Sequence, residues 1–245
     1  MAGHSKWANI KHKKAKADAQ KGKLYTKIAR EIIMAAKQGG GDPEANFALR
    51  IAIDKARSMN LPNENINRAI QRGVGAQDGD NYESFSYEGY GPGGVAIIVD
   101  LLSDNRNRTA SDIRHLFSKH GGNMGETGCV SYMFDRKGVI LIDREKEAHS
   151  EDDMLLIALE AGAEDLQIEE DSFQIITAPD ELETVRRSLQ EQGVQMESAE
   201  LSMLPQTMVA VDGEVAEKAL KLLNALEDHD DVQNVYTNAD IEDVE

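Results

Sequence analysis

Apolar positions along the chain fall first at helical spacing and later at the spacing of strands. Recurrence every three and four residues predicts three helices, at 24–38, 43–59 and 62–73. Asp42 is expected to cap the second helix, with Pro43 in its first turn, and Gly73 is expected to end the third. Short helices joined by glycine and proline turns predict a small three-helix bundle.

After a polar, glycine-containing segment at 74–81, which predicts a linker, strands and helices alternate. The expected elements are strands at 82–90 and 95–102, a helix from Thr109, and a strand at 129–134. Thr109 and Asp112 have the spacing of a capping box. The glycine-rich run 89–94 lacks the Lys-Ser/Thr of a phosphate-binding P-loop and is therefore predicted to be a turn between two strands.

Residues 138–201 follow the order strand, helix, strand, strand, helix, strand, which is the ferredoxin-like βαββαβ pattern. The segments after it are too short to fold alone and are expected to complete the earlier sheet, with a frayed acidic end from Asp240. The predicted fold is therefore α+β and multidomain, with a basic arm and three-helix bundle before an α/β domain that carries the ferredoxin-like insertion. The expected domains are 1–75, 82–134 together with 206–240, and 137–204.

Composition narrows the class of protein. With 245 residues and only 5% aromatic side chains, the chain is expected to build several small aliphatic cores. A single cysteine, Cys129, excludes an internal disulfide and suits a reducing compartment. The sequence lacks an apolar run long enough for a membrane span and lacks the pattern of a signal peptide. We therefore expect a cytoplasmic protein without a membrane partner.

Charge is strongly segregated along the chain. The first 30 residues contain nine Lys and Arg residues and one acid, Asp18, whereas the whole chain has a net charge of −17. Clustered cations recruit polyanions, so this basic arm predicts nucleic-acid binding. The candidate residues are Lys6, Trp7, Lys11, His12, Lys13, Lys14, Lys16, Lys21, Lys23, Lys27 and Arg30.

The simplest alternative is that the arm is only a solvated tail. Against this, it contains Trp7, the single tryptophan of the chain, which can stack on an exposed base. The helices that follow carry further cations that are expected to extend the basic surface: Lys37, Arg50, Lys55, Arg57, Arg68 and Arg72.

A second candidate is the segment that joins a buried strand to the helix expected from Thr109. Arg106 and Arg108 are placed there in a loop, beside the positive end of that helix. They predict an anion or partner contact. The alternative is a structural role in which they bridge to Asp104 or Asp112.

Searches for catalytic and metal sites find no convincing motif. His115 and His120 are five residues apart, which does not place two imidazoles on one metal ion, and both are expected at the surface or at a helix end. The carboxylates show no pair suited to acid–base catalysis. The sequence therefore predicts no catalytic residue, metal or cofactor.

Several long segments resemble one known family. The stretches AGHSKWANIKHKKAKADAQKGK, LPNENINRAIQRG, YEGYGPGG and LSDNRNRTASDIRHLFSKHGGNMGETGCVSYMF are similar to the YebC/PmpR family, whose mitochondrial relative activates translation of cytochrome c oxidase I. The family's N-terminal signature matches this chain at Gly3, His4, Ser5, Lys6, Trp7, Ile10, Lys11, Lys13 and Lys14.

The resemblance implies a helical bundle followed by two α/β domains, no enzymatic activity, and regulation of gene expression. Family members are labelled as DNA-binding transcriptional regulators, and others resemble translation factors that help the ribosome through proline-rich stretches. We therefore expect a DNA-binding regulator of transcription. The alternative is a factor that binds ribosomal RNA, which suits a basic arm with one aromatic residue. Nothing indicates an apolar heptad seam, and a monomer is expected.

Overall fold

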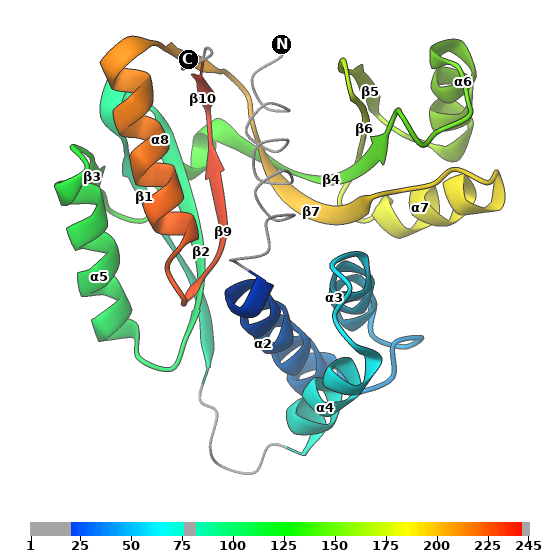
Figure 1. Cartoon of the computed structure of the whole chain (residues 1–245), viewed down its shortest axis with the longest axis horizontal. Helices are drawn as coiled ribbons and strands as arrows, with labels where there is room; N and C mark the ends of the chain where they lie inside the picture. Colours follow the sequence, from blue (N-terminus) through cyan, green and yellow to red (C-terminus); the bar gives the residue numbers. More distant parts are fainter. Residues whose placement is uncertain (1–20, 76–81, 242–245) are drawn as a thin grey trace.

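The computed structural model describes residues 21–75 and 82–241, and within these ranges the fold is α+β (Figure 1). A helical bundle lies beside two four-stranded sheets, each of which is covered by helices. The predicted 74–81 linker falls mostly outside the described residues. Most of the arm and all of the last four residues also lie outside them.

The bundle consists of α2 (Lys21–Gly39), α3 (Phe47–Ser58) and α4 (Asn63–Val74). Its core is aliphatic, with Ile28, Ile32 and Leu49 at most 1% exposed. The three predicted helices are confirmed, but the predicted start of the second is wrong. Asp42 forms a turn, and α3 begins after Asn46, whose carboxamide accepts from the Leu49 amide and donates to the Ala35 and Gly40 carbonyls.

Gly73 was predicted to end α4, but it lies buried inside this helix. A Cβ at this position would be 2.5 Å from the Ile33 carbonyl oxygen and 2.8 Å from the Ala36 Cβ. Glycine is therefore needed for the close approach of α4 to α2, and Gly75 occupies the cap.

The first sheet has the strand order β3-β1-β2-β9, with every neighbouring pair antiparallel. Its elements in chain order are β1 (Glu83–Tyr90), β2 (Ala96–Ser103), α5 (Arg106–Lys119), β3 (Asn123–Met124), α8 (Gly213–Glu227) and β9 (Val232–Thr237). A short 3-10 turn, η2 (Pro92–Gly94), joins β1 to β2, as the glycine-rich run predicted.

Helices α5 and α8 cover one face of this sheet. Ile97, Val99 and Leu101 of β2 point to the helices, while Ala96 and Ile98 point to the opposite face, against Val130 and Phe134. Burial on both faces explains the nearly continuous apolar run of this strand.

The chain end also differs from its prediction. Asp240 and Ile241 are not frayed but belong to β10 (Ala239–Ile241), which pairs in parallel with β8 (Val209–Val211). Ile241 is only 6% exposed and joins the core beneath α8. Burial of this apolar side chain outweighs the local acidic pattern.

The second sheet has the order β5-β6-β4-β7 and is antiparallel throughout. Its elements follow the expected βαββαβ sequence: β4 (Phe134–Asp143), α6 (Glu151–Ala161), β5 (Asp165–Ile168), β6 (Ser172–Thr177), α7 (Leu182–Glu191) and β7 (Ser198–Pro205). The predicted strand at 129–134 is wrong. A 3-10 turn, η3 (Ser131–Met133), occupies half of it, because the Glu88 carboxylate accepts hydrogen bonds from the amides of Gly128, Val130 and Ser131.

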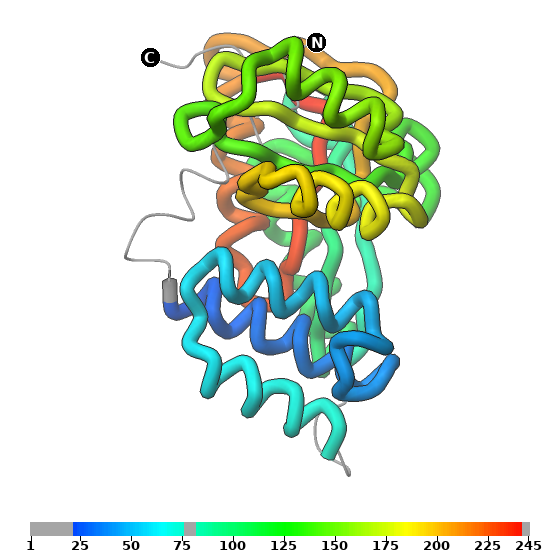
Figure 2. The backbone as a smooth tube through the Cα atoms, turned by 90° about the vertical axis from the view of Figure 1, so that its right-hand side faces the viewer, coloured from blue at the N-terminus to red at the C-terminus, as the bar shows by residue number. Residues whose placement is uncertain are grey.

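Helix α3 is the helix of the bundle that faces the second sheet, as the rotated view shows (Figure 2). Leu49 and Ile53 face α2 and α4, whereas Phe47 and Ile51 pack against the core under β7 and α7. Apolar residues on both sides of α3 therefore join the bundle to the rest of the molecule.

Candidate nucleic-acid interface

Only part of the predicted nucleic-acid site lies within the described residues. Seven of the candidates fall outside them: Lys6, Trp7, Lys11, His12, Lys13, Lys14 and Lys16. Lys21 begins α2, and nothing is described of its side chain. Lys23, Lys27 and Arg30 are fully described, and their contacts locate the end of the arm.

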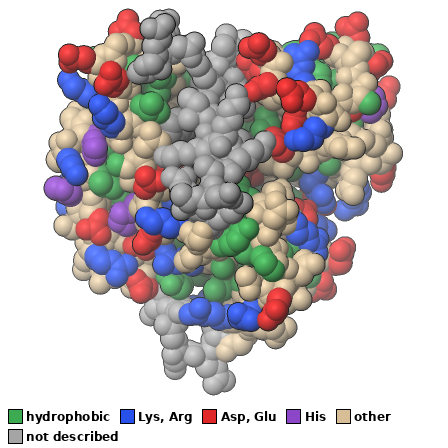
Figure 3. All heavy atoms as spheres, in the orientation of Figure 1, with side chains coloured by type: hydrophobic (Ala, Val, Ile, Leu, Met, Phe, Trp, Pro, Cys, Tyr) green, Lys and Arg blue, Asp and Glu red, His purple; other side chains and the backbone are tan. Residues whose placement is uncertain are grey.

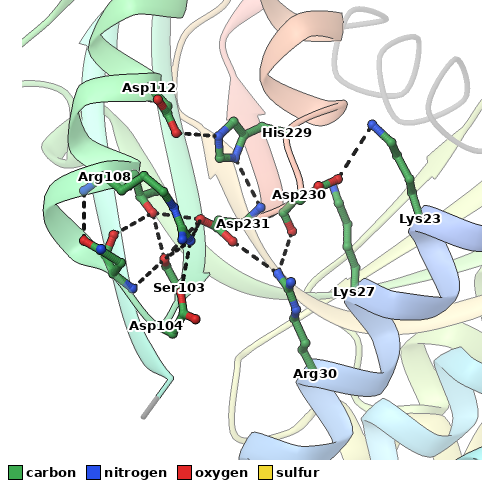
Figure 4. A network of polar contacts seen from close by, with 12 residues as sticks. Lys23, Lys27, Arg30, Ser103, Asp104, Arg108, Asp112, His229, Asp230 and Asp231 are labelled. Atoms are coloured by element: carbon green, nitrogen blue, oxygen red, sulfur yellow. Dashed lines mark hydrogen bonds and ion pairs between the residues drawn. The ribbon is translucent and has the colours of Figure 1, made fainter. Parts of the chain in front are cut away.

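Lys23, Lys27 and Arg30 follow one face of α2, because their spacing of four and three residues is helical. All three reach the turn between α8 and β9, defined here as the acidic turn, residues 227–231 (Figure 4). Lys27 Nζ donates to the Glu227 carbonyl at 2.6 Å and Lys23 Nζ to the Asp228 carbonyl at 3.3 Å. Arg30 donates to the Asp230 carbonyl at 3.0 Å and to Asp231 Oδ1 at 3.2 Å.

The acidic turn attracts these cations for two reasons. Carbonyl groups at the C-terminus of α8, such as that of Glu227, face out of the helix, and the helix dipole places negative potential there. The turn adds carboxylates, with Lys23 Nζ lying 3.6 Å from Asp230 Oδ1. Three side chains of α2 therefore converge on carbonyl and carboxylate oxygens of one turn of the same chain.

Asp231 is the buried centre of this network, with 5% of its surface exposed. Its Oδ2 accepts from Thr109 Oγ1 at 2.8 Å, Ser103 Oγ at 3.0 Å and Arg108 at 3.1 Å. Burial alone would raise the pKa of Asp231, but these hydrogen bonds outweigh it and hold the pKa below its ordinary value. The carboxylate therefore joins α2, β2 and α5.

The structure changes the setting of Arg106 and Arg108. They do not lie in a loop before Thr109, as predicted, but in the first turn of α5, which Asn105 caps by accepting from the Arg108 amide. Thr109 is fully buried and bonds to Ser103 and Asp231, which explains why it does not cap the helix.

Arg108 takes the structural role that was the alternative. It lies 3.0 Å from Asp104 and 3.1 Å from Asp231, whereas Asp112 lies 3.6 Å from His229 Nε2. Arg106 stacks over the Phe85 ring at 5.0 Å from its centroid. Both guanidinium groups thus have contacts within the chain, and a further contact to an anion remains a prediction.

Arg50 and Lys55 were expected to extend the basic surface, but they do not. Their side chains are each 20% exposed and lie between the bundle and the second sheet. Arg50 lies 3.5 Å from Glu183, and Lys55 lies 3.2 Å from Glu31 and 3.7 Å from Glu200. Burial lowers the pKa of Lys55, but the two carboxylates outweigh this and hold the pKa above its ordinary value.

Other kinds of site find little support in 21–75 and 82–241. No group of three or more His, Cys, Asp or Glu side chains in these ranges could hold a metal ion. The helices there are each too short or too polar to cross a bilayer. Cys129 is half-buried and does not belong to a strand. Burial together with the nearby Glu88 carboxylate raises the pKa of its thiol.

Sequence reasoning missed the acidic turn as the partner of α2. The run Glu227-Asp-His-Asp-Asp231 directly follows an amphipathic helix, so four acids at a helix C-terminus were a usable signal. Acids are unfavourable at that end unless cations compensate them. The required cations are about 200 positions earlier in the chain, which no local pattern reveals.

Comparison with known proteins accounts for nearly the whole chain. A family model described as the TACO1/YebC protein N-terminal domain matches residues 5–76, and one described as the TACO1/YebC second and third domain matches residues 82–239. Together the two models cover the bundle and both sheets.

Curated relatives are similar along their full length. A protein of Desulfitobacterium hafniense is 58% identical over 99% of this chain and 97% of its own length, and one of Pelotomaculum thermopropionicum is 56% identical over 99% and 100%. Both carry the name "Probable transcriptional regulatory protein". The crystal structure of a conserved hypothetical protein from Aquifex aeolicus is similar with a TM-score of 0.87 and 49% identity, over 94% of each chain.

Proposed function

The chain belongs to the TACO1/YebC family, and on that premise we propose that it is a non-enzymatic regulator of gene expression that acts by binding nucleic acid. The names of its relatives support a regulatory role. The N-terminal arm and the exposed beginning of α2 are the proposed binding surface.

The observation that carries this proposal is the placement of the basic segment. Lys27 and Arg30 anchor α2 to the acidic turn, while Lys23, with 61% of its side chain exposed, remains accessible at the beginning of the helix. The arm thus joins the described chain beside α8, on a body that is otherwise acidic. Phosphates would bind to the cations of the arm and to Lys23. Lys27 and Arg30 would hold α2 in place and so position these cations.

DNA is the first candidate target, because the relatives are named as transcriptional regulators. Selection of particular genes requires contacts to base edges. Within the described residues, the Arg- and Asn-rich beginning of α5 most resembles a base-reading surface, but Asn105 caps the helix, Arg106 stacks on Phe85 and Arg108 binds Asp231. The proposed DNA contacts are therefore mainly to phosphates.

Ribosomal RNA is the second candidate, in a factor that relieves stalling at proline-rich stretches. The observation that favours it is the lysine-rich arm with a single aromatic residue, Trp7. Lysines bind phosphates without reading sequence, and an aromatic ring can stack on an unpaired base of irregular RNA. On either reading we expect the protein to act in the cytoplasm as a monomer.

The proposal includes three domains, at 1–75, at 82–134 with 206–240, and at 137–204. It is supported by the separate apolar cores of the bundle and of the two sheets. The boundary between the two family models, at residues 76 and 82, agrees with the first division.

The first prediction tests the arm. In the intact chain, Lys6, Lys11, Lys13, Lys14 and Lys16 are replaced together by Gln, and the affinity for duplex DNA and for single-stranded RNA is measured against salt concentration. If all five contact phosphates, the log–log slope should flatten by about 4.5 on the duplex and about 3.5 on the single strand. A matched variant with Arg at the same positions should keep the slope. An unchanged slope in the Gln variant would contradict the proposed surface.

The target is identified by a paired measurement on the same proteins. Co-sedimentation with ribosomes is compared with retention on promoter-bearing duplex DNA, both at near-physiological salt. Arm-dependent binding to ribosomes with weak, sequence-indifferent DNA retention supports the translation factor. Sequence-selective DNA retention without ribosome binding supports the transcriptional regulator.

A further inference from the structure

Helix α5 has a net positive charge, whereas the part of the chain in which it lies is net negative. Beyond residue 81 the sequence contains 12 Lys and Arg residues against 36 acids. Four of these cations belong to α5, which has one acid, Asp112. The helix therefore forms a basic element in a body of opposite sign.

Among the described residues beyond 81, every cation outside α5 except Arg136 of β4 forms an ion pair, whereas Arg114 and Lys119 of α5 do not. Lys137, Arg144, Arg186, Lys218 and Lys221 each form an ion pair with a carboxylate of the chain. By contrast, Arg114 and Lys119 are exposed, and among the described residues no carboxylate lies within ion-pair distance of either. Unpaired cations on an acidic protein are available to an external anion.

These cations form a group with neighbouring ionisable side chains. Burial lowers the pKa of His120, and the nearby Lys119, His115 and Lys221 lower it further. His115 and Lys119 are four residues apart and share one face of α5. Basic and histidine side chains gather along the edge formed by α5 and α8, on the left of Figure 3.

The same edge is continuous with the site proposed above. Halfway along α5, Asp112 lies 3.6 Å from His229, which belongs to the acidic turn that holds α2. At the other end, His120 lies near Lys221 of α8. A nucleic acid bound by the arm at the start of α2 would thus reach the outer face of α5 by passing this turn.

We propose that the outer face of α5, with Arg114, His115 and Lys119, forms a second phosphate-binding surface for the nucleic acid that the arm binds. The inference rests on the proposed function and extends it. Clustered cations on a rigid helix contact the phosphate backbone without reading sequence. The second surface would orient the bound strand across the molecule.

The test uses the intact chain with Arg114→Gln and Lys119→Gln together. Both side chains are exposed, so the fold should be retained, which a thermal unfolding curve checks. Affinity for a mixed-sequence single-stranded RNA and for a duplex DNA is measured against salt. Loss of two phosphate contacts should flatten the log–log slope by about 1.4 on RNA and about 1.8 on DNA, and weaken binding about tenfold.

The matched control removes two paired, exposed cations, one in the turn after β4 and one in α7, as Lys146→Gln and Arg187→Gln, and should keep the wild-type slope. The five-lysine arm variant is measured in parallel. If the arm variant loses slope but the α5 variant matches the control, the second surface is wrong and the proposed function stands. If neither variant differs from the wild type, both proposals fail.

Discussion

Asp231 shows how one side chain can determine the placement of several elements. Its two oxygens bind α2 through Arg30, α5 through Arg108 and Thr109, and β2 through Ser103. A buried carboxylate is costly unless its partners compensate for lost hydration. Here the compensation comes from three segments distant in sequence, so the carboxylate stabilises the arrangement only when all of them are in place.

Replacement of Asp231 by Asn should destabilise the fold by about 2–4 kcal/mol, because an amide cannot accept from all of these donors and leaves Arg30 and Arg108 without the charge. Urea unfolding measures the loss. Asp230→Asn is the control, since the Asp230 side chain is 70% exposed and should matter little.

The effect of Asp231 should also depend on pH. Its pKa is lowered in the folded state, so its contribution is complete above the unfolded value of about 3.9 and is lost as the pH falls through the folded value. The difference in stability between the wild type and Asp231→Asn should therefore be constant above about pH 5 and shrink below about pH 4. A difference that does not shrink in acid would assign the effect to packing.

At the scale of elements, the helices of the bundle differ in what they pack against. Helix α4 presses its Gly73 onto the backbone of α2. Helix α3 uses two apolar faces, one for the bundle and one for the core beneath β7 and α7. The bundle is therefore organised by close backbone contact on one side and by side-chain packing across to the sheet on the other.

Gly73→Ala should destabilise the bundle by about 1–3 kcal/mol, because the added methyl group overlaps the Ile33 carbonyl and forces α4 away from α2. Circular dichroism during thermal unfolding measures the effect. Gly22→Ala is the matched control: nothing lies within 4 Å of the added carbon, and Ala favours the helix. The control should leave stability equal or slightly higher, and equal losses in both variants would contradict the packing argument.

For the whole molecule, ion pairs link the bundle to the second sheet. Lys55 of α3 contacts Glu31 of α2 and Glu200 of β7, and Arg186 of α7 lies 3.4 Å from Asp54. The same helix, α3, also makes the apolar contact through Phe47 and Ile51. Together these contacts determine how the bundle, and the arm attached to it, is oriented toward the sheets.

Lys55→Met should cost about 1–2 kcal/mol, since it removes the cation that contacts both Glu31 and Glu200. Hydrogen exchange should become faster in α3 and β7. Arg57→Met, which removes a cation that is 63% exposed and 3.8 Å from Asp54, is the control and should leave exchange unchanged. Unchanged exchange in Lys55→Met would show that apolar packing alone joins the two parts.

Local sequence patterns were sufficient to predict most helices and strands, including the order of the βαββαβ segment, because apolar periodicity reports which side of an element is buried. They were also sufficient to locate the basic arm, since charge is a property of composition. They failed where a residue contacts a part of the chain that is distant in sequence. Gly73 packs against the Ile33 carbonyl, Thr109 donates to Asp231, and amides near 129–134 donate to the Glu88 carboxylate.

The contacts of α2 depended on the folded chain for the same reason. The sequence shows three cations at helical spacing and, some 200 positions later, an acidic turn, but only the folded chain brings the beginning of α2 to this turn and makes them partners. Charge and periodicity can be read from neighbouring residues, whereas the pairing of charges depends on distances between elements. Those distances are set by the buried cores, to which residues from the whole chain contribute.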